Sequence, residues 1–197
     1  MRKINFYEHE IKKNYRDVNR SISSLFLTSG PITRKVEKLI SKRFNKKYCY
    51  LTNSWTNGVI SLFLSLNLKK DDEVIIPANT FVACANVVEM VGCKLVIADI
   101  DKNTKLLSIP DTLKKITKKT KLIMPVHLYG NIFNVFQLKN KIRKNIFILE
   151  DCAHCFSGHY QNKKIGTSSD FAVFSFYATK NITCGEGGAI ILNNKNH

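Results

Sequence analysis

Short apolar runs alternate along the chain with longer segments whose apolar residues recur every three or four positions. The spacing of Ile32, Val36 and Leu39 is typical of a helix with one buried face. The predicted helices are 31–45, 54–68, 79–92, 111–117 and 135–145. The predicted strands are 48–51, 73–77, 94–100, 121–126, 146–150, 171–176 and 189–193.

The predicted strands are unbroken apolar runs, such as "EVIIP" at 73–77 and "FAVFSF" at 171–176. Strands of this kind are buried on both faces of their sheet, and the helices between them supply the cover. The repeated strand–helix–strand order therefore predicts an α/β fold, a three-layer sandwich around a mainly parallel, mixed sheet.

The net charge of +16 changes the picture only slightly. It suits either a nucleic-acid or anionic-membrane partner, or lysines spread over solvated faces. The second interpretation is favoured, because the lysines are scattered and are not interleaved with aromatic residues on one element. The apolar runs are too short for a membrane span, and the charged N-terminus has no apolar core of a signal peptide. We expect a cytoplasmic protein with no membrane or nucleic-acid partner.

Six cysteines, in a chain without a secretion signal, are expected to be reduced thiols. Cys152 and Cys155 form a C-x-x-C pair, with His154 between them and His159 beyond. This spacing raises the possibility of a zinc or redox site, which would need a second ligand pair or a thioredoxin-like context. No second pair is present in the sequence, so we predict no metal.

Ligands of open α/β sheets bind beyond the carboxyl ends of the strands, so the residues after each predicted strand are the candidates for a binding site. The small polar stretch 52–58 leads into a helix, where Trp55 and Thr56 could help to hold a phosphate. An ordinary helix cap is the alternative. Phe81 could stack on a planar ligand or belong to the core. His127, after another strand, is more often a structural histidine.

Two further positions carry a charge at a strand end. Asp151 follows the buried strand 146–150 and could hold a protonated ring nitrogen, bind a metal or cap a helix. Lys180 follows the strand 171–176 and could form a Schiff base, although a solvated lysine is the alternative. A phosphate cradle, a stacking aromatic, an acid and an amine are together the parts of a pyridoxal phosphate site.

Five ordered segments resemble the DegT/StrS-type nucleotide-sugar aminotransferases, a branch of the fold-type I pyridoxal phosphate enzymes. The resemblance runs from about Thr28 to Asn193. It is carried by "TSGPITRKVEKL", "DDEVIIPANTFVACANVVEMVGCKLVIADID", "IMPVHLYGN", "ILEDCAHCFSG" and "FSFYATKNITCGEGGAI". The last segment is highly specific for this family.

The resemblance implies a role for particular residues around the cofactor ring. Lys180 matches the lysine that forms the internal aldimine, and is therefore the implied catalytic residue. Asp151 matches the acid that pairs with the pyridinium nitrogen. His154 matches a Gln/His position near the phenolic oxygen of the ring, and Phe81 matches the aromatic residue that stacks on it.

The phosphate side of the implied site departs from the family pattern. Ser175 matches a phosphate-binding serine, and Trp55 and Thr56 fall at the "GT" of the family's "SGTxAL" loop. Because Trp55 replaces a glycine, only its backbone N–H is expected to take over that role. Gly58 replaces an alanine within the helix.

The resemblance further implies a sugar aminotransferase that binds pyridoxal 5′-phosphate, acts on a keto-sugar nucleotide and takes its amino group from glutamate. Family members are homodimers of about twice this length, with a C-terminal small domain. We therefore interpret residues 1–30 as an N-terminal arm and residues 31–197 as an incomplete cofactor-binding large domain. The alternatives are a truncated, non-catalytic remnant and a related sugar dehydratase. Lys180 argues against the dehydratase, in which histidine typically replaces this lysine.

Overall fold

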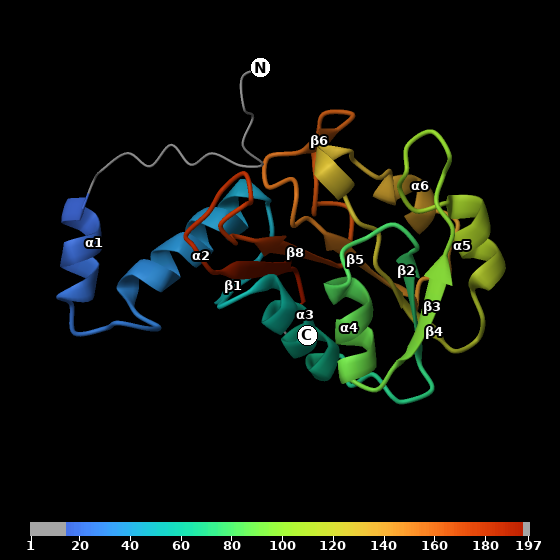
Figure 1. Cartoon of the computed structure of the whole chain (residues 1–197), viewed down its shortest axis with the longest axis horizontal. Helices are drawn as coiled ribbons and strands as arrows, with labels where there is room; N and C mark the ends of the chain where they lie inside the picture. The colour runs from blue at the N-terminus through green and yellow to red at the C-terminus, as the bar shows by residue number, and fades with distance from the viewer. Residues whose placement is uncertain (1–14, 195–197) are drawn as a thin grey trace, which may run out of the picture.

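A mixed sheet of seven strands lies at the centre of the chain, in a computed structural model that describes residues 15–194 (Figure 1). The strands are β1 (Tyr48–Thr52), β2 (Glu73–Pro77), β3 (Lys94–Ala98), β4 (Thr120–Ile123), β5 (Phe147–Asp151), β8 (Phe171–Ser175) and β9 (Gly188–Leu192). Their order across the sheet is β1-β9-β8-β5-β4-β2-β3. The five strands from β8 to β3 are parallel, and β9 is antiparallel to both of its neighbours.

Helices cover both faces of this sheet. They are α2 (Pro31–Arg43), α3 (Trp55–Ser65), α4 (Ala83–Met90), α5 (Ile109–Lys115) and α6 (Val135–Lys139), with a 3₁₀ turn η1 (Leu128–Gly130). A further helix, α1 (Tyr15–Ile22), buries none of its residues and lies apart from the sheet (Figure 1). Along β8, Phe171 and Val173 belong to the core beneath α3, whereas Ala172 and Phe174 belong to the core beneath α2. This alternation places α2 and α3 on opposite faces, which confirms the predicted three-layer α/β fold.

Local sequence explains where several elements begin and end. Pro31 occupies the first turn of α2, where its missing N–H costs no hydrogen bond. The Ser54 hydroxyl caps α3 by accepting from the N–H of Asn57 at 3.2 Å. The side chains of Val74, Ile75 and Ile76 on β2 are fully buried, and each contributes about 2 kcal/mol of hydrophobic stabilisation.

The structure corrects some predicted boundaries. The helix expected at 79–92 begins only at Ala83, because residues 79–82 form a bend that carries Phe81 to the surface. The helix expected at 135–145 ends at Lys139, and residues 140–146 form turns. The sequence patterns also missed α1 and a short hairpin, β6 (His159–Tyr160) and β7 (Lys163–Lys164). Residues 1–14 of the predicted arm lie outside the described residues.

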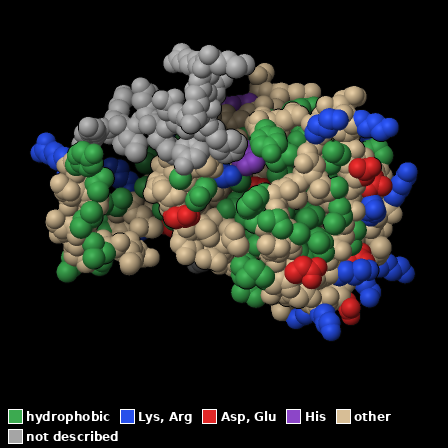
Figure 2. Space-filling model, viewed as in Figure 1, with side chains coloured by type: hydrophobic (Ala, Val, Ile, Leu, Met, Phe, Trp, Pro, Cys, Tyr) green, Lys and Arg blue, Asp and Glu red, His purple; other side chains and the backbone are tan. Residues whose placement is uncertain are grey.

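The surface bears on the charge interpretation. On the face drawn in Figure 2, most Lys and Arg side chains lie along the right-hand margin, with Asp and Glu side chains between them, and a few lie at the left. Acidic side chains therefore interrupt the basic residues on this face. Within residues 15–194, no helix combines the length and the apolar character that a membrane span requires.

Candidate active site

The sheet register brings the strand ends with candidate residues to one edge. Thr52 at the end of β1 pairs with Gly188 at the start of β9, and Gly188 pairs with Ser175 at the end of β8. On the next strand of the sheet, Asp151 at the end of β5 pairs with Val173. The candidate phosphate loop, serine and acid therefore follow one another along the carboxyl edge of the sheet.

The N-terminus of α3 is held close to this edge. A Cβ added to Gly188 would lie 2.7 Å from the carbonyl group of Ser54, so only glycine lets the strand and the helix start approach so closely. The first intrahelical hydrogen bond is donated by Gly58 to Ser54. The N–H groups of Trp55 and Thr56 precede it and remain available to an anion, as at helix N-termini in general.

Asp151 is the most deeply buried of the predicted site residues that carry a charge, with 4% of its surface exposed. Its Oδ1 accepts from the N–H of Ala153 at 2.9 Å, and its Oδ2 accepts from the thiol of Cys84 at 3.3 Å. Burial raises the pKa of Asp151, and these two hydrogen bonds offset that effect only in part. A nearby cation would stabilise this carboxylate.

Lys180 and His154 lie within electrostatic reach of this carboxylate. Partial burial lowers the pKa of the Lys180 amine, and the charge of Asp151 opposes that shift. Burial also lowers the pKa of His154, and the positive charge of Lys180 adds to the effect. The backbone N–H of Tyr129 donates to Nδ1 of His154 at 3.1 Å, so the proton of the neutral ring lies on Nε2.

Two aromatic side chains at this edge are open to solvent. Phe81 is 69% exposed, so it does not belong to the core. Tyr129 is 87% exposed, and its ring stacks on His154 with the ring centroids 5.5 Å apart.

Ser175 is buried, and its hydroxyl accepts from the N–H of Tyr177 at 3.3 Å. The roles that the family resemblance implies for Phe81, Ser175 and the other site residues remain predictions.

The sequence patterns did not single out Cys84 as part of this site. Cys84 is three residues after Phe81, in the first turn of α4, and its thiol donates to Asp151. Burial raises the pKa of this thiol, so it remains protonated and acts as a donor. The sequence does offer one signal for Cys84. This residue lies in the stretch 78–86, which follows the predicted strand 73–77 at the carboxyl edge of the sheet.

A second carboxylate, Glu150, points to the other face of the sheet and has different partners. Its Oε2 lies 2.9 Å from Nε2 of His127 and accepts from the N–H of Gly166 at 2.7 Å. Burial alone would raise the pKa of Glu150, but its hydrogen bonds, including those with His127 and with the N–H of Gly166, outweigh burial and lower the pKa. His127 is therefore part of a buried structural pair, as its predicted structural role requires.

Among residues 15–194, one group of side chains has the spacing of a metal site: His127, Glu150 and Cys152. The backbone N–H of Phe133 donates to Nδ1 of His127 at 3.1 Å. This contact places the ring proton on Nε2, which then donates to Glu150 and has no lone pair for a metal ion. The group is better explained as a hydrogen-bonded network than as a metal centre.

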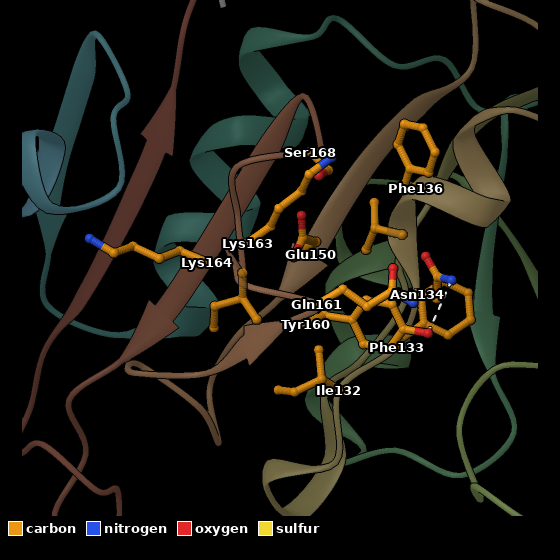
Figure 3. Close-up of a pocket in the computed structure, with 12 residues that line it drawn as sticks. Ile132, Phe133, Asn134, Phe136, Glu150, Tyr160, Gln161, Lys163, Lys164 and Ser168 are labelled. Atoms are coloured by element: carbon orange, nitrogen blue, oxygen red, sulfur yellow. Dashed lines mark hydrogen bonds between the residues drawn. The ribbon is translucent and has the colours of Figure 1, made fainter.

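Glu150 also lines a small cavity of about 120 Å³, shown in Figure 3. Asn134 donates to the hydroxyl of Tyr160 across this cavity at 3.2 Å, as the dashed line marks. Neither Asp151 nor Lys180 is among its lining residues. The cavity is therefore separate from the candidate active site.

Comparison with known proteins identifies the family. The sequence model of the DegT/DnrJ/EryC1/StrS aminotransferase family matches residues 8–197. The chain belongs to this family. The relationship predicted from the five sequence segments is thus confirmed.

Three relatives of this DegT/DnrJ/EryC1/StrS chain are informative. GDP-perosamine synthase of Escherichia coli O157:H7 is 35% identical over 90% of this chain and 50% of its own. The sugar aminotransferase Spr1654 of Streptococcus pneumoniae, in its PLP-form, is 31% identical with a TM-score of 0.85, over 92% of this chain and 50% of its own. An E. coli GDP-4-keto-6-deoxy-D-mannose-3-dehydratase is 28% identical with a TM-score of 0.80, over 85% and 45%.

The chain thus spans about half the length of the relatives it matches. The solved forms of Spr1654 include a PLP-form and a PMP-form, and the family is dependent on pyridoxal phosphate. This agrees with the cofactor predicted from the sequence. The residues at the carboxyl edge also fit such a group: α3 offers free N–H groups, Asp151 offers a buried carboxylate, and Lys180 offers a half-buried amine.

Proposed function

We propose that this chain forms the cofactor-binding part of an aminotransferase that transfers an amino group from glutamate to a keto-sugar nucleotide. The observation that carries this proposal is the place of Lys180 in the loop after β8, the strand that pairs with β5 where β5 ends at the buried carboxylate of Asp151. The similarity to GDP-perosamine synthase and to a sugar aminotransferase supports the substrate class. By family resemblance, we expect the working protein to be a homodimer in the cytoplasm.

When bound, pyridoxal phosphate supplies an aldehyde for covalent attachment and a ring that accepts electrons from the reacting carbon. The N–H groups at the start of α3 and the hydroxyl of Ser175 would bind its phosphate. Asp151 would hold a proton on the ring nitrogen by charge pairing. Phe81 would stack on one face of the ring.

The surroundings of Lys180 suit it to two tasks. Because partial burial lowers its pKa, more of its amine is neutral near pH 7 than for a solvated lysine. A neutral amine can attach to an aldehyde, and once displaced it can move a proton between the α carbon of the donor and the C4′ carbon of the cofactor. The Nε2–H of His154 would donate a hydrogen bond to the phenolic oxygen of the ring.

Covalent capture of the cofactor tests the proposal on the 197-residue chain. The chain is mixed with a small excess of pyridoxal phosphate, reduced with borohydride and mapped by mass spectrometry. We expect the mass increase on the peptide with Lys180, and at least a tenfold loss of labelling in Lys180→Ala. Lys102→Ala, which removes an exposed lysine, is the matched control and should label like the unmodified chain.

Labelling spread over many surface lysines, and unaffected by Lys180→Ala, would contradict the proposal and favour a non-catalytic protein. Sugar dehydratase activity is the alternative function, because one structural relative is a dehydratase. Lys180 favours the aminotransferase. Glutamate should convert the bound cofactor to its amine form in one turnover, which absorbance spectroscopy follows.

A further inference from the structure

Cys84 lies within a chain of hydrogen bonds that ends at Asp151. The hydroxyl of Thr80 donates to the sulfur of Cys84 at 3.0 Å, and the thiol donates to Oδ2 of Asp151 at 3.3 Å. Cys84 is 1% exposed. A fully buried thiol thus contacts the carboxylate on which the proposed function depends.

The two contacts of Asp151 hold its carboxylate from two different elements. Ala153, in the loop after β5, holds Oδ1, and Cys84, on α4, holds Oδ2. A carboxylate held at both oxygens cannot turn about its Cβ–Cγ bond without breaking one hydrogen bond. Each oxygen retains a further lone pair, so a ring nitrogen can still be accepted.

We propose that Cys84 is a positioning residue, whose thiol orients the Asp151 carboxylate toward the ring nitrogen of the cofactor. This inference rests on the proposed function, because it assigns Asp151 to that nitrogen. It concerns a side chain of this chain only, and it does not require Cys84 to touch the cofactor.

The groups that act on Asp151 come from four elements. They are Cys84 on α4, His127 after β4, His154 and the Ala153 N–H after β5, and Lys180 after β8. Burial raises the pKa of Asp151, whereas the Cys84 hydrogen bond lowers it. Removing the thiol should therefore raise the pKa of Asp151 further, and leave less carboxylate to pair with a protonated ring.

The test compares Cys84→Ala and Cys84→Ser with a matched control, Cys93→Ala. Cys93 is a buried thiol in the same core, and it donates to the carbonyl of Lys69 rather than to Asp151. The first measurement is the pKa of Asp151 in the cofactor-free chain, from the pH dependence of its carboxyl ¹³C NMR signal. We expect Cys84→Ala to raise this pKa, Cys84→Ser to keep or lower it, and Cys93→Ala to leave it unchanged.

The second measurement is the dissociation constant of pyridoxal phosphate, followed by the absorbance of the bound cofactor. The loss of one hydrogen bond to a charged group should weaken binding by roughly tenfold in Cys84→Ala, and the serine variant should recover most of it. Thr80→Val, which removes the hydroxyl that holds the sulfur, should act in the same direction and more weakly.

Equal Asp151 titrations and equal cofactor affinities in Cys84→Ala and Cys93→Ala would overturn the positioning role. If the unmodified chain failed to bind pyridoxal phosphate, the proposed function would fail, while the titration would still decide whether the thiol controls Asp151. The two hypotheses are therefore tested separately.

Discussion

Glu150 and Asp151 are neighbours on one strand, and burial acts to raise the pKa of both, yet their net pKa shifts have opposite directions. Glu150 faces the side of Gly166 and is held by His127, and its pKa is lowered. Asp151 faces α4 and has one backbone N–H and one thiol, and its pKa is raised. Both side chains are almost completely buried. The difference indicates that Glu150 stabilises the fold, whereas Asp151 is left with a charge that a ligand can compensate.

The largest expected effect is on stability, at Glu150. Glu150→Ala would leave the Nε2–H of His127 and the N–H of Gly166 without an acceptor in the core. We expect a loss of about 3 kcal/mol in the free energy of unfolding, because the donors of a buried charged group lose their partner. Urea unfolding of the cofactor-free chain measures it.

Asp151→Ala is the matched variant for this comparison. It removes a carboxylate of similar burial whose contacts are weaker, so its loss should be less than half as large. Equal losses in the free energy of unfolding for the two alanine variants would show that the two carboxylates have the same structural role, and would contradict the difference drawn between them.

The second prediction concerns the cofactor. Asp151→Asn keeps the size of the side chain but removes its charge, so the ring nitrogen loses its ionic partner. Affinity for pyridoxal phosphate should fall by about a hundredfold. Glu150→Gln is the control, because it changes the charge of the neighbouring carboxylate on the other face. The control should bind the cofactor within about threefold of the unmodified chain, since Glu150 lies outside the candidate site.

Much of the fold was predictable because its strands are buried on both faces. Unbroken apolar runs such as 73–77 can hardly be anything but central strands, and the structure has β2 at those residues. Because ligands of open α/β sheets bind beyond the carboxyl ends of the strands, Asp151 and Ser175 could be placed at one edge of the sheet from the sequence alone. The antiparallel insertion of β9 between β8 and β1 did not follow from that pattern.

What the sequence patterns missed depends on contacts or on weak local signals. The hairpin β6–β7 has strands of two residues and a turn at Gln161 and Asn162, both with positive φ, where Asn-Gly is the recognisable signal. The link between Cys84 and Asp151 depends on where α4 begins, and the apolar periodicity of 79–92 placed that start four residues too early. Cys84 and Asp151 lie 67 positions apart in the sequence, and composition alone does not show that two such distant residues are in contact.

The smallest expected effect separates function from stability at Asp151 itself. Because burial raises its pKa above the ordinary value of 3.8, this group favours folding most below that pH and disfavours it as the pH rises through the folded-state pKa. Asp151→Asn has no charge to bury. It should therefore stabilise the cofactor-free chain at pH 7 by about 1 kcal/mol, and the gain should shrink as the pH falls toward 4. Urea unfolding of both chains across this range measures the gain. A gain that stayed constant with pH would show that burial of the charge is not its cause. A variant that is more stable but binds pyridoxal phosphate poorly would show that this carboxylate costs stability and serves to bind a cation.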